Sequence, residues 1–447
     1  MRKGIVIWML ILSCLLSGCG AGEQSADPTD STIQPATRPT AVPEEQPVYD
    51  WMAGESPVPN LRVGRVRQGL QHIGSTTSEK GTYFVYKPSW MLDVTPPSPW
   101  ILYTDHGSDM VIKLCGRPDC THDTTDCNAY VDGGEYITYY EGYLYIFDCG
   151  YDGTGISSGN RCTLLQMNPD GTKRTEVFDF REFAKQQGND GAVCEFVADG
   201  YCMITTIDYI TAYQSDGSIS TTSEHKDTYR YKLDGSMKQP EKVTTRGVPL
   251  YECGDVLLLW DPVSEKGGEY GSYWDYDIAT DTRTFLTDHP GTAGYYGKEV
   301  GFYFKDGSLH RLTYATGKDE VVMKTELTGK YDVKCFPDCF VLADCDFKSE
   351  KPDMNLYFYN WAFQLVDTVK INYPCDLFMV SDVIIGETPS QFILSNGSGA
   401  VMPKYYINKS ELGTGQVEIH TYNMPDLSYY LQEQAEEQED QEWFENG

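Results

Sequence analysis

Residues 163–178 read TLLQMNPDGTKRTEVF, and this stretch contains the clearest structural signal in the chain. Short runs of strand-forming residues, 163–167 and 175–178, lie on either side of the turn sequence Asn168-Pro169-Asp170-Gly171. Asp-Gly between two such runs is a strong hairpin signal, because glycine accepts a positive φ without strain. The stretch therefore predicts two antiparallel strands joined by a tight turn.

Similar strand–turn–strand patterns recur along the chain. They are predicted at residues 110–114, 229–244, 273–281, 309–318, 356–366 and 404–419. An additional apolar strand precedes most of them, and the average spacing is about 49 residues, the length of a four-stranded propeller blade. Seven hairpins predict an all-β, seven-bladed β-propeller, although six or eight blades also fit the irregular spacing. We expect residues 62–85 to supply a strand that closes the ring with the last blade, and residues 180–188 to form a short helix.

The N-terminus has the pattern of a secretory signal. Met1-Arg2-Lys3 is basic, residues 4–16 carry no charge, and Leu16-Ser17-Gly18-Cys19 matches a bacterial lipobox. The apolar run is shorter than the roughly 20 residues of a membrane-spanning helix. We therefore predict a signal peptide at residues 1–18. Cys19 is then the lipidated first residue, carrying acyl chains such as palmitate, on the extracytoplasmic side of the cell membrane. The alternative is an ordinary signal peptide with a chance cysteine.

Composition divides the remaining chain. Residues 19–48 are rich in Pro, Thr, Ser, Gln and Glu, which predicts a disordered tether. Residues 49–432 are expected to form the propeller. Residues 433–447 carry seven acidic side chains and no Lys or Arg, which predicts a solvated acidic tail. The formal charge of the whole chain is -31, and it becomes -33 once Arg2 and Lys3 are removed. Such a charge repels phosphate backbones, so we expect no nucleic-acid partner.

Residues 114–127, LCGRPDCTHDTTDC, hold the sharpest cluster of potential metal ligands, where the first blade should have its hairpin turn. Cys115, Cys120, His122 and Cys127 follow the pattern Cys-x4-Cys-x-His-x4-Cys. Three thiolates and one imidazole complete a tetrahedral set for Zn²⁺, typical of closed structural sites. The pattern therefore predicts one structural zinc that staples the loop.

Disulfides compete with a metal outside the membrane. Cys115 with Cys120, or Cys120 with Cys127, could bond and leave one thiol free, and three reduced thiols without a metal are a third alternative. Cys335 and Cys339 are spaced so that they could also form a bridge.

The lipobox and residues 115–127 resemble those of a group of uncharacterised lipoproteins from anaerobic Gram-positive bacteria. That group shares a comparable Cys-x4-Cys-x-His-x4-Cys segment and a propeller-like body. The resemblance implies a fold and a cellular address, and it implies no activity.

No catalytic motif stands out. Residues 155–159 fit Gly-x-Ser-x-Gly but lack the preceding strand and following helix that a nucleophile elbow needs. We therefore expect a binding or scaffold propeller that is anchored by lipid and meets an envelope protein or glycan. The alternative is a glycan- or peptide-processing enzyme with an active site at the mouth of the channel.

Overall fold

A computed structural model describes residues 48–58, 61–62, 74–86, 100–122, 126–131, 134–149, 162–213, 219–253, 256–267, 270–290, 294–325, 330–345, 354–371, 383–395 and 403–425. All of them belong to the second of two compact units, Gln46–Gly447; the first is Met1–Glu45. Signal peptide, Cys19, residues 155–159 and the acidic tail lie outside the described residues. Within the described ranges, no helix is long and apolar enough to cross a membrane.

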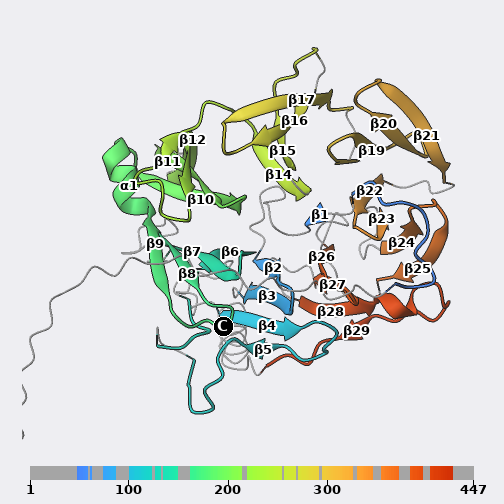
Figure 1. The fold of residues 1–447 in the computed structure, drawn as a ribbon, viewed down its shortest axis with the longest axis horizontal. Helices are drawn as coiled ribbons and strands as arrows, with labels where there is room; N and C mark the ends of the chain where they lie inside the picture. Colours follow the sequence, from blue (N-terminus) through green and yellow to red (C-terminus); the bar gives the residue numbers. More distant parts are fainter. Residues whose placement is uncertain are drawn as a thin grey trace, which may run out of the picture. The chain divides into compact units, whose positions relative to one another are not determined.

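The described strands form seven antiparallel sheets, so the prediction of a seven-bladed β-propeller is confirmed (Figure 1). Each blade is built from four strands that are consecutive in the chain. Blade 1 contains β2 (Ser75–Thr77), β3 (Gly81–Tyr86), β4 (Trp100–Asp105) and β5 (Ile112–Lys113). Blade 2 contains β6 (Gly134–Tyr140), β7 (Tyr143–Cys149), β8 (Cys162–Met167) and β9 (Thr175–Asp179). Blade 3 contains β10 (Gly191–Ala198), β11 (Tyr201–Tyr213), β12 (Ile219–Lys232) and β13 (Glu241–Lys242).

The remaining blades follow the same order. Blade 4 contains β14 (Val248–Cys253), β15 (Val256–Asp261), β16 (Ser272–Asp277) and β17 (Thr282–Asp288). Blade 5 contains β18 (Gly294–Tyr296), β19 (Val300–Lys305), β20 (Ser308–Thr313) and β21 (Lys318–Lys324). Blade 6 contains β22 (Lys330–Cys335), β23 (Cys339–Cys345), β24 (Met354–Asn360) and β25 (Leu365–Lys370). Blade 7 contains β26 (Ile384–Glu387), β27 (Gln391–Ser395), β28 (Pro403–Asn408) and β29 (His420–Thr421), with the 3-10 turn η1 (Lys409–Glu411) before β29.

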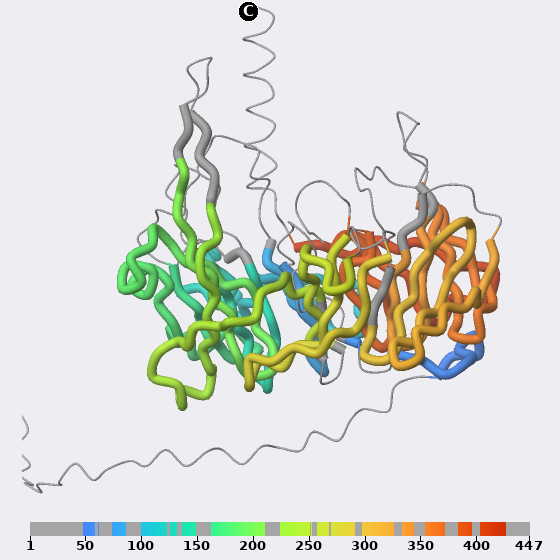
Figure 2. Tube along the Cα trace, turned by 90° about the horizontal axis from the view of Figure 1, so that it is seen from above, coloured from blue at the N-terminus to red at the C-terminus, as the bar shows by residue number. Residues whose placement is uncertain are grey.

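Local sequence explains the elements that were predicted. The hairpin of residues 163–178 becomes β8 and β9, and Gly171 takes a φ of 78° where a Cβ would lie 2.7 Å from the Asn128 carbonyl oxygen. The expected short helix is α1 (Phe180–Gln187), which begins after the capping Asp179 and ends at the left-handed Gly188. β11 and β12 are longer than blade strands usually are, and they rise from the ring as a ribbon (Figure 2).

The ring closes differently from our prediction. Among the described residues of the range 62–85, none forms a strand of blade 7, and β2 and β3 belong to blade 1. Closure occurs at the outer edge, where the Val111 amide donates to the Asn423 carbonyl (3.0 Å) and the Asn423 amide donates to the Asp109 carbonyl (2.7 Å). The end of blade 3 contacts a turn of blade 4 in a similar way, because the Thr244 amide donates to the Asp281 carboxylate. Blades 1 and 7 therefore exchange no strand in the described part of the ring.

The segment before the first blade forms a strap across blades 6 and 7 (blue in Figure 2). The Trp51 side chain is 8% exposed, and its indole donates to the Lys409 carbonyl at 2.7 Å. Gly54 has a φ of 85° and passes so close to Trp361 that a Cβ would lie 2.3 Å from its carbonyl carbon. Only glycine fits this crossing.

The strap then enters the ring. Val58 is fully buried, and β1 (Leu61–Arg62) pairs with β14, the strand at the inner edge of blade 4 (Figure 1). The strap therefore contributes a fifth strand to blade 4 and fills part of the space that the inner strands surround.

Candidate metal centre

The Cys/His loop leaves the outer strand of blade 1. It follows β5 and leads to β6, so it connects blade 1 to blade 2, whereas the hairpin turn of blade 1 is residues 106–111. The predicted position in the hairpin turn was therefore wrong by one strand, because β5 has only two residues and gives little sequence signal. Three hydrogen bonds hold the loop to blade 1: the Leu114 amide to the Ile101 carbonyl (2.9 Å), the Ile101 amide to the Ala129 carbonyl (2.7 Å) and the Trp100 indole to the His122 carbonyl (2.7 Å).

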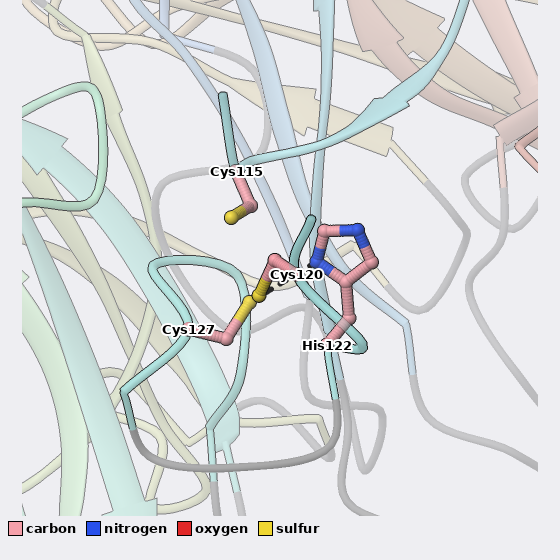
Figure 3. A group of neighbouring side chains, drawn as sticks. All are labelled: Cys115, Cys120, His122 and Cys127. Atoms are coloured by element: carbon pink, nitrogen blue, oxygen red, sulfur yellow. Dashed lines mark hydrogen bonds between the residues drawn. The ribbon is translucent and has the colours of Figure 1, made fainter. Parts of the chain in front are cut away.

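The four predicted ligands converge. Their ligand atoms, three sulfurs and one imidazole nitrogen, all lie within 4.8 Å of one another (Figure 3). His122 Nδ1 is 3.2 Å from Cys127 Sγ, which identifies Nδ1 as the ring nitrogen turned towards the sulfurs. His122 has a φ of 63°, so the chain bends sharply there and returns its ring to the cysteines. All three cysteines are free thiols in the structure, with no disulfide between them.

Polar groups outside the four ligands point at the sulfurs. The Arg117 guanidinium donates to Cys120 Sγ at 3.4 Å and also to the Asp126 carbonyl, which joins the two ends of the loop. The Ala129 amide donates to Cys127 Sγ at 3.3 Å. A Zn²⁺ held by three thiolates would carry a net charge of -1, and these donors would stabilise that charge.

The thiols differ in their tendency to ionise. Burial raises the pKa of the Cys127 thiol to about 11, against the opposing hydrogen bond from the Ala129 amide. Burial also acts on Cys115, but hydrogen bonds from the backbone and guanidinium of Arg117 outweigh it and lower the Cys115 pKa to about 7. Metal binding at neutral pH would therefore displace the proton of Cys127.

The cluster lies where blades 1 and 2 pack together. Cys127 is 1% exposed and belongs to a hydrophobic core that includes Ile101 of blade 1 and Leu165 of blade 2. Arg174, which precedes β9 in blade 2, donates to the Tyr130 carbonyl at 2.6 Å. Four protein ligands leave no open position, so a metal here would fasten the junction of two blades and would not activate a substrate.

Sequence reasoning missed the supporting residues. Trp100 and Arg174 are 22 and 44 residues from their partners, so no local pattern reveals them. Arg117 lies inside the Cys-x4-Cys interval, so its place as a cation among three thiols could have predicted that it supports the site.

The other cysteines show several states. Cys162 is disulfide-bonded, and the strand register places Cys149 opposite it. Cys339 is a free thiol, so the predicted bridge between Cys335 and Cys339 is not formed in the structure. Cys194 and Cys202 are buried free thiols whose sulfurs lie 3.6 Å apart.

Comparisons with known proteins give only distant similarities. Neither a scan against protein-family models nor a search of curated proteins gives a match. Among solved structures, the chain is similar to the β-propeller domain of the Trilobed protease from Pyrococcus furiosus (11% identity, TM-score 0.31, 68% of this chain and 98% of that chain). A second is Porphyromonas gingivalis dipeptidyl peptidase 4 (10% identity, TM-score 0.34, 77% of this chain and 50% of that chain). A third is a chain of a mitotic checkpoint complex (9% identity, TM-score 0.36, 86% of this chain and 99% of that chain). Similarity at this level carries no argument about activity.

Proposed function

We propose that this chain is a bacterial lipoprotein, anchored through Cys19 to the outer side of the cell membrane, whose propeller binds an envelope protein or a glycan. The lipobox at residues 16–19 supports the anchor. The resemblance to lipoproteins of anaerobic Gram-positive bacteria supports the same address. Two acyl chains hold a protein at a membrane stably, whereas one is marginal.

We further propose that Cys115, Cys120, His122 and Cys127 bind one structural Zn²⁺. The observation that carries this proposal is the convergence of four ligand atoms within 4.8 Å. Their chemistry, three sulfurs and one imidazole, suits Zn²⁺ better than the oxygen-preferring ions Mg²⁺ or Ca²⁺.

Binding suits this molecule better than catalysis. The one constellation of metal ligands found among the described residues has no open coordination position.

Two measurements on protein from its native membrane test the proposal. Mass spectrometry of the N-terminal peptide should find a diacylglyceryl group on Cys19, and Cys19→Ala should leave the protein unprocessed by the lipoprotein pathway. Elemental analysis should find about one zinc per chain. An unmodified N-terminus refutes the anchor. Turnover of a glycan or peptide panel that one carboxylate substitution abolishes would refute the binding function.

A further inference from the structure

A cluster of three charged side chains lies at the junction of blades 6 and 7. Lys409 Nζ is 2.8 Å from Asp338 Oδ2 and 2.5 Å from Glu387 Oε1. The side chains are 2% exposed for Lys409, 9% for Glu387 and 18% for Asp338. One ammonium group therefore faces two carboxylates with little water around it.

The backbone holds the two ends of this contact in place. The Lys409 amide donates to the Ser390 carbonyl at 2.8 Å, and the Lys409 carbonyl accepts from the Trp51 indole at 2.7 Å. Asp338 lies in the turn between β22 and β23, and the Trp361 indole donates to the Pro337 carbonyl at 3.1 Å. Groups held at contact distance in this way react as if they were at very high concentration.

An aromatic ring lies beside the amine. Lys409 Nζ lies 4.9 Å from the centre of the Phe392 ring, and Phe392 is fully buried. Burial raises the pKa of Glu387 above its usual value, although Lys409 opposes this. Burial also lowers the pKa of Lys409, but the two carboxylates outweigh it and favour the ammonium form. A proton on Glu387 makes these three side chains neutral overall. The ammonium group of Lys334, which is 8% exposed and donates to the Ile384 carbonyl at 2.6 Å, is a further charge that acts on Glu387. If one proton then moves from Lys409 to Asp338, all three groups are uncharged. Burial favours this uncharged state relative to the charged one, whereas water favours the charged one.

We propose that Lys409 and Asp338 condense to an intramolecular amide bond, with Glu387 moving the protons. The amine nitrogen of Lys409 attacks Cγ of the Asp338 carboxylic acid, while the Glu387 carboxyl group gives its proton to the carbonyl oxygen of Asp338. The resulting Glu387 carboxylate takes a proton from the attacking nitrogen. Glu387 then passes this proton to one of the two hydroxyls on Cγ, the bond from Cγ to that oxygen breaks, and the oxygen leaves as water. The remaining hydroxyl returns its proton to Glu387 and becomes the amide carbonyl. One N–C bond forms, one C–O bond breaks, and no atom changes its oxidation state, so no cofactor or co-reactant is needed.

The difference in exposure assigns the two carboxylates. Asp338 is the more exposed, so the water that it loses can reach solvent. Glu387 is the more deeply buried and has the raised pKa that a proton donor needs. The amide would join residues 71 positions apart in the chain and tie blade 6 to blade 7 beneath the strap.

The chain contains a matched control. Lys226 Nζ also faces two carboxylates, Glu224 at 2.6 Å and Asp208 at 3.4 Å. There the side chains are 32%, 52% and 35% exposed, in that order. Water stabilises all three charged forms there, so the uncharged amine and carboxylic acid that the condensation needs are not favoured.

The test is peptide mapping of the full-length folded protein by tandem mass spectrometry. We expect a branched peptide that joins Lys409 to Asp338 and weighs one water molecule less than its two parts, while Lys226 stays in linear peptides. Glu387→Gln should restore the linear peptides, and Lys226→Arg should leave the branched peptide unchanged.

Mapping of the wild-type protein decides the question without any variant. Linear peptides containing an unmodified Lys409 would show that the cluster is a buried ion pair only and would overturn the proposal. A branch to Glu387 would overturn the assignment of the acylated residue. If Glu387→Gln fails to fold, the wild-type map still gives the answer.

Discussion

Zinc should stabilise the folded propeller through its hold on blades 1 and 2, and Cys120→Ser should remove this effect. Cys120 is half-buried, whereas Cys127 is 1% exposed. Substituting Cys120 therefore removes a metal ligand with little loss of core packing, so the change reports on the metal.

The size of the effect follows from binding linkage. Zinc that binds only the folded state adds about 4 kcal/mol when its free concentration is a thousand times Kd. An unfolding entropy of about 2.1 cal/mol/K per residue amounts to roughly 0.8 kcal/mol/K for a propeller of this size. The wild-type Tm should therefore rise by about 5 °C on adding zinc to chelator-treated protein.

Differential scanning calorimetry with and without zinc makes the measurement. Cys120→Ser should show no zinc-dependent change in Tm. Cys202→Ala is the matched control, because Cys202 is a fully buried thiol of blade 3 outside the cluster. Cys202→Ala should show the same zinc-dependent rise in Tm as the wild type, even if its Tm without zinc is different. An identical Tm for the wild type in chelator and in zinc would refute the reasoning.

Three further outcomes are expected. Zinc affinity should fall as the pH falls from about 11 through neutrality, because protons compete for the thiolates and the pKa of Cys127 without metal is about 11. The release of protons on binding is measurable by calorimetry in two buffers. A pH-independent affinity would contradict thiolate ligation. Arg117→Ala should weaken zinc binding about 10-fold, because it removes the hydrogen-bond donor to Cys120. Arg311→Ala is the control, since Arg311 is exposed. Equal zinc affinities of the two variants in a competition assay would show that the Arg117 guanidinium does not support the site. Trp51→Ala should lower the free energy of unfolding by about 3–5 kcal/mol and the Tm by roughly 4–6 °C. Val48→Ala is the control and should leave the Tm unchanged, because Val48 is 88% exposed. Equal Tm values for the two variants would show that the strap does not stabilise the propeller.

The sequence predicted what is encoded locally. Asp170 and Gly171 fix a turn by their own conformational preferences, so the hairpin could be recognised from a few residues. The metal ligands lie within one loop of 13 residues, 115–127, so their convergence needed no knowledge of the rest of the chain.

Contacts between distant segments could not be predicted in this way. β1 has two residues, and nothing in Leu61 or Arg62 indicates that they pair with blade 4. Ring closure at Asn423 depends on backbone groups, which every residue carries. The contact of Lys409 with Asp338 spans 71 positions, and each residue alone looks like an ordinary surface charge.

X-ray absorption at the zinc edge of the purified protein would identify the ligands of the metal. We expect a zinc shell of three sulfurs at about 2.3 Å and one nitrogen at about 2.0 Å, with the nitrogen lost in His122→Ala. A shell of oxygen ligands, or metal-free protein with a disulfide mapped to Cys115, Cys120 or Cys127, would contradict it.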